Sequence, residues 1–165
     1  MPGQLTYEVE GPIGVDGQRI EAYGLGFVIT GIAEAAALPA GKLVVFDTAG
    51  GRTDKAVKAP SATGQVTTVL GVAGITLWDP TYPEPPYPIG QALPVIRKGR
   101  VAIAAETALA IHTNPFVRFA AGAGGTVLGA LRADADTATA VAAPYLHVVK
   151  ASTAAGDIAI VEIDL

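Results

Sequence analysis

The fold class is decided by the stretch Pro88-Ile-Gly-Gln-Ala-Leu-Pro-Val-Ile-Arg-Lys-Gly-Arg-Val-Ala-Ile-Ala-Ala-Glu106. It contains two largely apolar runs, Gln91–Ile96 and Arg100–Ala105, which lie on either side of Lys98-Gly99. Glycine supplies the positive φ that a tight turn commonly requires. The pattern therefore predicts a β-hairpin with its turn at Lys98-Gly99.

The second predicted strand is apolar on both faces, because Val101 and Ile103 share one face and Ala102 and Ala104 share the other. A strand that is covered on both sides belongs inside a β-sandwich or a barrel. Pro94, in the first strand, has no N–H to donate to a neighbouring strand. This places Pro94 at a sheet edge or at a bulge.

The tip of the predicted hairpin, Arg97-Lys98-Gly99-Arg100, concentrates three cations in a chain whose formal net charge is −4. Two interpretations of these cations remain open. They either keep an exposed turn solvated, or they meet an acidic surface on a partner protein.

Length and composition favour a single domain of 165 residues with one substantial core. Half of the residues are hydrophobic but only 6% are aromatic, so we expect a core of small side chains and closely approaching backbones. The net negative charge offers no basic field for a nucleic-acid backbone. Because the chain has no cysteine, disulfides, thiolate nucleophiles and cysteine-based metal sites are excluded.

Neither a secretory signal nor a membrane span is expected. Met1–Glu10 lacks the basic region and the apolar region of a signal peptide. Ala59–Trp78 is uncharged throughout, but it contains Pro60 and several glycines and is better interpreted as a turn plus strands. We therefore expect a soluble protein that is synthesised in the cytoplasm.

Short extended runs separated by glycine and proline recur along the chain, about every 8–12 residues, as in a β-meander. One helical turn is predicted at Ala33–Leu38, before Pro39. No long helical pattern is present, so we predict an all-β domain of roughly eight to ten short strands. The predicted strands are Phe27–Thr30, Lys42–Asp47, Asp54–Lys58, Phe116–Phe119, Thr126–Arg132, Tyr145–Lys150 and Asp157–Leu165, with others within Gln65–Trp78.

The N-terminal segment differs in composition from the rest of the chain, since proline and glycine interrupt it repeatedly between short extended runs. We predict an extended arm or a series of short strands over residues 1–25, and a β-barrel or sandwich domain over residues 26–165. Arms of this kind become ordered when something ties them down, which in assemblies is often a neighbouring subunit.

Asp79–Pro88 contains five prolines and is predicted to be a stiff, extended loop that leads into the predicted hairpin. Tyr82, Glu84 and Tyr87 lie in this loop. A rigid aromatic loop loses little entropy on binding and could form a recognition surface. The alternative is that the loop packs on its own barrel.

Asp134-Ala-Asp136 is the one close carboxylate pair away from the termini, and such a pair can begin a calcium loop. A calcium loop continues with a third oxygen donor and a glycine at fixed spacing, and neither is convincing here. A solvated turn is therefore the favoured interpretation, and we predict no metal or cofactor.

No catalytic constellation emerges from the sequence. His112 and His147 are the two histidines. His147 lies between Leu146 and Val148 in a predicted strand, where it is expected on the opposite face as a polar or interface residue. A nucleophile elbow, a paired-histidine zinc motif and a phosphate loop are all absent. We therefore predict that the protein is not an enzyme.

Five segments occur in an order that resembles the structural cement, or capsid decoration, proteins of tailed bacteriophages. These segments are Val69–Ala73, Tyr87–Ile103, Pro115–Phe119, Thr126–Asp136 and Ile158–Ile163. The resemblance implies a small β-barrel or jelly-roll-like sandwich on the outside of an icosahedral head. It also implies that the protein bridges neighbouring major capsid subunits, does no chemistry, and is a virion component made in the host cytoplasm.

Contacts with the capsid or with sister subunits are inferred from expected exposure and rigidity. The inferred residues are Leu5, Tyr7, Val9 and Ile13 of the arm, Tyr82, Glu84 and Tyr87 of the proline loop, and Arg97, Lys98 and Arg100 of the tip. Self-association into a trimer is favoured over a dimer, and neither nucleic acid nor a membrane is expected as a partner. The competing function is a carbohydrate-binding β-sandwich whose aromatic platform would be Trp78, Tyr82 and Tyr87.

Overall fold

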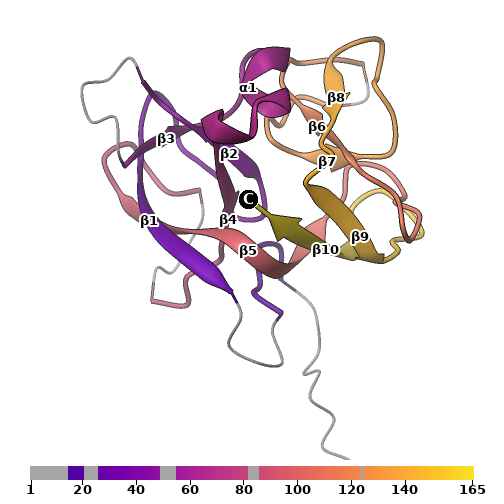
Figure 1. The fold of residues 1–165 in the computed structure, drawn as a ribbon, viewed down its shortest axis with the longest axis horizontal. Coiled ribbons are helices and arrows are strands. Elements are labelled where there is room, and N and C mark those ends of the chain that lie inside the picture. Colours follow the sequence, from indigo (N-terminus) through magenta and orange to yellow (C-terminus); the bar gives the residue numbers. More distant parts are fainter. Residues whose placement is uncertain (1–14, 21–25, 49–54, 82–85, 124) are drawn as a thin grey trace, which may run out of the picture.

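The computed structural model describes residues 15–20, 26–48, 55–81, 86–123 and 125–165 (Figure 1). Its strands are β1 (Phe27–Ala33), β2 (Leu43–Phe46), β3 (Ala56–Lys58), β4 (Val72–Thr76), β5 (Ala92–Ala104), β6 (Phe116–Arg118), β7 (Leu131–Arg132), β8 (Ala140–Ala142), β9 (Leu146–Lys150) and β10 (Ile158–Asp164). The helical elements are α1 (Thr63–Thr67) and the 3₁₀ turn η1 (Val69–Gly71). The all-β prediction is thus confirmed.

Five strands close into a barrel. Their order is β1-β3-β2-β4-β5, and β5 pairs back with β1. β1 is antiparallel to β5, with Val28 opposite Ile96, and parallel to β3, with Ile32 opposite Ala56. The predicted meander is wrong here, because β3 lies between β1 and β2 and closes the gap between them. Closure leaves these strands without free edges.

The predicted hairpin is also wrong, because β5 runs without reversal through Lys98 and Gly99. Gly99 does have a positive φ, of 128°, but in a strand interior this conformation gives a bend rather than a turn. The bend falls where β5 changes partners. Its first half pairs with β1 and β4, and its second half pairs with β10 from Lys98 to Ala104.

Pro94 lies one residue beyond Val95, the last residue of β5 that pairs with β4. Its carbonyl accepts a hydrogen bond from the Leu77 N–H at 2.9 Å. The Leu77 carbonyl accepts a hydrogen bond from the Tyr87 hydroxyl at 2.8 Å and therefore does not depend on an N–H at position 94, which is the physical reason that proline is tolerated in so well-paired a strand.

Two apolar cores flank the barrel wall. The inner core combines small and medium side chains with the buried ring of Tyr87. It is so tight that a Cβ on Gly31 would lie 2.9 Å from a Val57 methyl carbon. The outer core lies between the barrel and a second layer formed by β9, β10 and the three-stranded sheet β7-β6-β8. Figure 1 shows this layer to the right of the barrel. Outer-core residues include Leu43, Val45, Ile75, Ile96, Val117, Leu131, Leu146 and Val161.

Two local predictions need correction, and two short elements were not predicted. Residues 35 and 36 form a bend instead of a helical turn, and Ala35 has a φ of 67°. Of the strand predicted at Thr126–Arg132 only β7 forms, because Gly129 adopts a φ of 81° and lies so close to β2 that a Cβ there would be 2.2 Å from the Leu43 carbonyl oxygen. β8 and α1 were not predicted, since neither has a sustained apolar period.

Candidate functional site

The predicted cationic tip lies in the middle of β5, where it forms one charged face with β10. Lys98 is directly opposite Asp164, and Arg100 is directly opposite Glu162. The Lys98 Nζ and Asp164 Oδ1 atoms are 2.9 Å apart, as are Arg100 Nε and Glu162 Oε2. The hydrogen bond to Asp164 raises the pKa of Lys98 above its ordinary value. Lys98 and Arg100 are therefore each paired with a carboxylate of the same chain.

Arg97 differs from its two neighbours because its side chain leaves the charged face. Its guanidinium carbon lies 5.7 Å from the centre of the Phe46 ring, which is a cation–π distance. Its Nε is buried and makes no hydrogen bond within the part of the chain that the structure describes. Arg97 is thus partly a packing residue.

Tyr87 is not available as a contact residue, which corrects its inferred role. The side chain is buried, its hydroxyl donates to the Leu77 carbonyl at 2.8 Å, and the Asp79 N–H donates to that hydroxyl at 2.9 Å. The end of the proline loop therefore packs on its own barrel. Trp78 is partly exposed, whereas Tyr82 and Glu84 lie outside the described residues.

The arm residues Leu5, Tyr7, Val9 and Ile13 also lie outside the described residues. The chain that follows them is anchored. Asp16 forms an ion pair with Lys42 and accepts a hydrogen bond from the Ala104 N–H at 2.9 Å. Gly17 donates to the Ala102 carbonyl at 2.8 Å, and its own carbonyl accepts from the Trp78 N–H at 2.9 Å. Residues 15–20 are thus fastened across the second half of β5.

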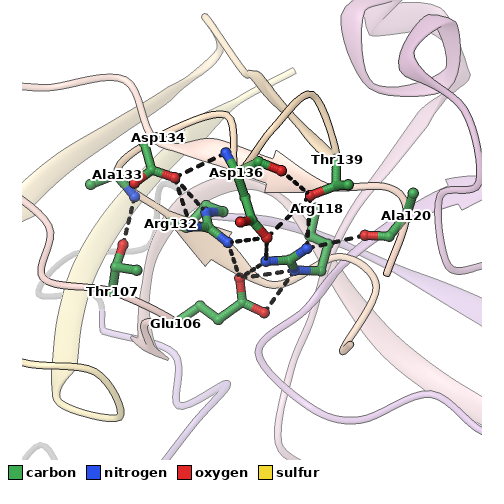
Figure 2. Close-up of polar contacts among 9 residues, drawn as sticks. All are labelled: Glu106, Thr107, Arg118, Ala120, Arg132, Ala133, Asp134, Asp136 and Thr139. Atoms are coloured by element: carbon green, nitrogen blue, oxygen red, sulfur yellow. Dashed lines mark hydrogen bonds and ion pairs between the residues drawn. The ribbon is translucent and has the colours of Figure 1, made fainter. Parts of the chain in front are cut away.

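A buried charged cluster beneath the small sheet was not predicted from the sequence (Figure 2). At its centre is Arg118 of β6, whose side chain is 0% exposed. Arg118 Nε and Nη2 donate to Glu106 at 2.8–2.9 Å, and Nη2 also donates to Asp136 at 2.6 Å. Nη1 donates to the Ala120 carbonyl at 3.1 Å and to Thr139 at 3.0 Å. All five N–H groups of the guanidinium therefore have acceptors.

Arg132 of β7 completes this cluster. It contacts Asp134 at 2.6 Å, Asp136 at 2.8 Å and Glu106 at 3.2 Å. Three carboxylates thus face two guanidinium groups, and the hydrogen bonds to Glu106 raise the pKa of Arg118 above its ordinary value. Asp136 is largely buried, so the prediction of a solvated turn at Asp134 and Asp136 is wrong for Asp136.

The cluster is enclosed by glycines and by a left-handed turn. A Cβ on Gly122 would lie 2.6 Å from the Thr139 hydroxyl oxygen, and a Cβ on Gly125 would collide with the Glu106 carboxylate. Asp136, Thr137 and Ala138 all have positive φ, at 40°, 56° and 66°. Three consecutive non-glycine residues in this region are strained, and the ion pairs of Asp136 with both arginines hold them there.

A signal for the cluster is present in the sequence. Arg118 and Arg132 each lie within an apolar run that predicts a buried strand, and a buried cation requires an acidic partner. Asp134 and Asp136 follow directly. Taken together, these residues would have predicted ion pairing in place of a solvated turn.

The described residues include no group of three or more histidine, cysteine or acidic side chains placed to hold a metal ion. Over the same ranges, no helix has the length and apolar character needed to cross a membrane. His147 is exposed, as predicted, while Leu146 and Val148 are buried. Its Nδ1 lies 3.1 Å from the Asn114 amide nitrogen.

The fold defines a small β-barrel protein, and in its three-stranded sheet the two buried arginines are paired with carboxylates of the same chain. Residues 4–164 match the family described as structural cement protein (E217 gp24/Pam3 gp6). The chain therefore belongs to this family. A chain from a structure titled "The capsid of Myoviridae Phage XM1" has the same fold, with a TM-score of 0.66 and 17% identity over 91% of this chain and 89% of that one. No curated protein matches the sequence.

Proposed function

We propose that the protein binds the outside of an assembled phage head and bridges neighbouring major capsid subunits, without catalysing a reaction. The observation that carries the proposal is the match to the structural cement family over nearly the whole chain. The one large charged cluster in the described ranges supports the non-catalytic part of the proposal. Its arginine donors bond to acceptors within the chain and are therefore not presented to a substrate.

Stabilisation would follow from mass action. A protein that binds the assembled shell, and not its dissociated subunits, shifts the equilibrium towards the shell by an amount set by concentration and affinity. Because the contact is repeated around the head, even a gain below about 1 kcal/mol per copy would add up over many copies.

The contacts that we propose combine the arm and the charged face. The arm residues Leu5–Ile13 and the loop residues Tyr82 and Glu84 remain candidates, as do Lys98 and Arg100. Asp164 and Glu162 of β10 lie directly opposite these two cations of β5. A complementary surface would therefore carry both signs of charge. We further propose a trimer, in which one patch is repeated around an axis.

Cosedimentation with heads of the cognate phage that lack the protein tests the proposed function. We expect saturable binding at a fixed copy number per capsid subunit, together with greater resistance of the heads to heating. Absence of binding to expanded heads would contradict the proposal. Light scattering of the free protein would separate a trimer from a dimer.

The carbohydrate-binding alternative is weakened by the position of Tyr87. Stacking on a sugar needs several aromatic faces on one surface, whereas the Tyr87 ring is buried and its hydroxyl is engaged by Leu77 and Asp79. We therefore do not propose it.

A further inference from the structure

The most exposed large apolar side chain in the described part of the chain is Leu70, in η1. It is 88% exposed, and its neighbour Val69 is 41% exposed. Exposing both side chains to water is unfavourable unless another surface covers them. We name the exposed residues of Ser61–Leu70 the α1–η1 ridge.

The backbone under the α1–η1 ridge is held in place from below. Val66 is fully buried, and the Tyr145 hydroxyl donates to its carbonyl at 2.9 Å. The Thr68 N–H donates to the Gly64 carbonyl at 3.2 Å, and the Gly71 N–H donates to the Thr68 carbonyl at 2.8 Å. Leu70 is therefore presented on a fixed backbone, which lowers the entropy lost on binding.

The α1–η1 ridge is also free of charge. It lies within Ala59–Trp78, which contains none of the 26 lysine, arginine, aspartate and glutamate residues of the chain. Its exposed positions are Ser61, Ala62, Thr63, Gly64, Thr67, Thr68, Val69 and Leu70. Depletion of charge around an apolar anchor is typical of the core of a protein interface.

We propose that the α1–η1 ridge is a second capsid-binding surface, in which Leu70 enters an apolar hollow on an uncharged patch of a major capsid subunit. This inference rests on the proposed function. A charged group on the partner would be buried against the ridge without a counter-ion, so the complementary patch must be uncharged as well.

Bridging is the reason for choosing a capsid subunit as the occupant. A bridge needs contact surfaces on different elements, and the α1–η1 ridge shares no residue with the charged face of β5 and β10. Figure 1 shows α1 at the top of the molecule and β5 crossing its lower part. The two surfaces can therefore engage two subunits at once.

The test compares Leu70→Asp with Ile111→Asp in cosedimentation with heads that lack the protein. Ile111 is a matched control because it is also apolar and 50% exposed, but lies outside the ridge. We expect Leu70→Asp to bind about 10-fold or more weakly, and Ile111→Asp to bind like the wild type. Circular dichroism melts should show that both variants remain folded.

Photocrosslinking from position 70 identifies the occupant. A benzophenone side chain there should crosslink to the capsid subunit, and one at position 111 should not. Unchanged binding by Leu70→Asp, or crosslinks to a second copy of the chain alone, would overturn the ridge proposal and leave the proposed function standing. If the wild-type protein itself fails to bind heads, the proposed function fails and the ridge proposal falls with it.

Discussion

Arg118 shows at the scale of single residues how a chain with few charged side chains uses them. Its guanidinium is fully buried and every donor is matched. Removing a partner from such a group is far more costly than removing an exposed pair, because the charges left behind stay buried and unpaired.

Arg118→Met should therefore destabilise the protein by about 3–5 kcal/mol, because Glu106 and Asp136 would lose their main cation. Arg100→Met removes an exposed pair and should cost about 1 kcal/mol or less. Urea unfolding of the two variants measures the difference. Equal midpoints would show that the cluster does not contribute to stability.

The pH dependence of stability should carry a contribution from Tyr145. Burial raises the pKa of its hydroxyl above the ordinary value, so above a pH of about 10 the unfolded chain releases this proton while the folded chain retains it. Stability is then fully present below that pH and falls as pH rises. Urea midpoints between about pH 9 and 11 should decline less in Tyr145→Phe than in the wild type. Parallel declines would refute this assignment.

At the scale of elements, a few backbone conformations with positive φ position the strands, and these conformations cannot be predicted from residue type alone. The turn over Asp136, Thr137 and Ala138 is left-handed although it contains no glycine. It joins β7 to β8 and carries Asp136 to the arginines. The reverse case is Gly99, which has a positive φ and yet makes no turn.

Replacing Ala138 by glycine should stabilise the protein by roughly 0.5–1 kcal/mol, because glycine adopts a positive φ without strain. Ala135→Gly is the control, since Ala135 is exposed in the same loop but is not among the residues with positive φ. This control should be neutral or slightly destabilising. A loss of stability in Ala138→Gly would mean that the turn is not strained.

Gly125→Ala should destabilise the protein by about 1–3 kcal/mol, because its Cβ would displace Glu106 from Arg118. Gly64→Ala is the matched control, since a Cβ at Gly64 in α1 meets no atom within 4 Å. There, alanine should stabilise the helix by about 0.5–1 kcal/mol. Thermal unfolding of both variants tests whether the glycines enclose the cluster.

Apolar runs were sufficient to predict most strands, including those near Phe27–Thr30, Phe116–Phe119 and Asp157–Leu165. They could not distinguish a hairpin from one bent strand, because glycine with a positive φ fits both. The difference depends on long-range pairing of β5 with β10, which no local pattern encodes. β8 was not predicted for the same reason, because its three residues pair with β6, which is distant in the sequence.

The candidate site was less predictable than the fold. Tyr87 was inferred to be a contact residue because it lies in a rigid aromatic loop, with packing on the barrel as the alternative. The structure shows the packed arrangement, and the burial of Tyr87 depends on the distant residues Leu38 and Leu77. The exposure of Leu70 could not be predicted from the sequence either. A leucine within an apolar run is usually part of the core.

The whole molecule is organised around β5, which pairs with β1, β4 and β10. Residues 17–20 occupy the other side of its second half, with Arg19 opposite Val101. Asp16 secures this segment through Lys42 and the Ala104 N–H. The first described residues and the last strand are therefore joined through a single strand.

Asp16→Ala should loosen this junction without unfolding the barrel. We expect faster hydrogen exchange at the Gly17, Ala102 and Ala104 amides, because Ala104 loses its acceptor and its neighbours lose their anchor. Amides of the β6–β8 ladder serve as the internal control and should exchange as in the wild type. Uniform acceleration over both regions would instead indicate global destabilisation.

The pairing around β5 also determines how the molecule carries mechanical load. Residues 17–20 and β10 are both antiparallel to β5 and flank it on opposite sides. Tension applied between Val15 and Leu165 would pull these two segments in opposite directions along the strand axis. The hydrogen bonds on both sides of β5 would then be sheared together instead of being peeled apart one at a time. Such a clamp resists stretching, which suits a protein proposed to hold neighbouring subunits of a shell together.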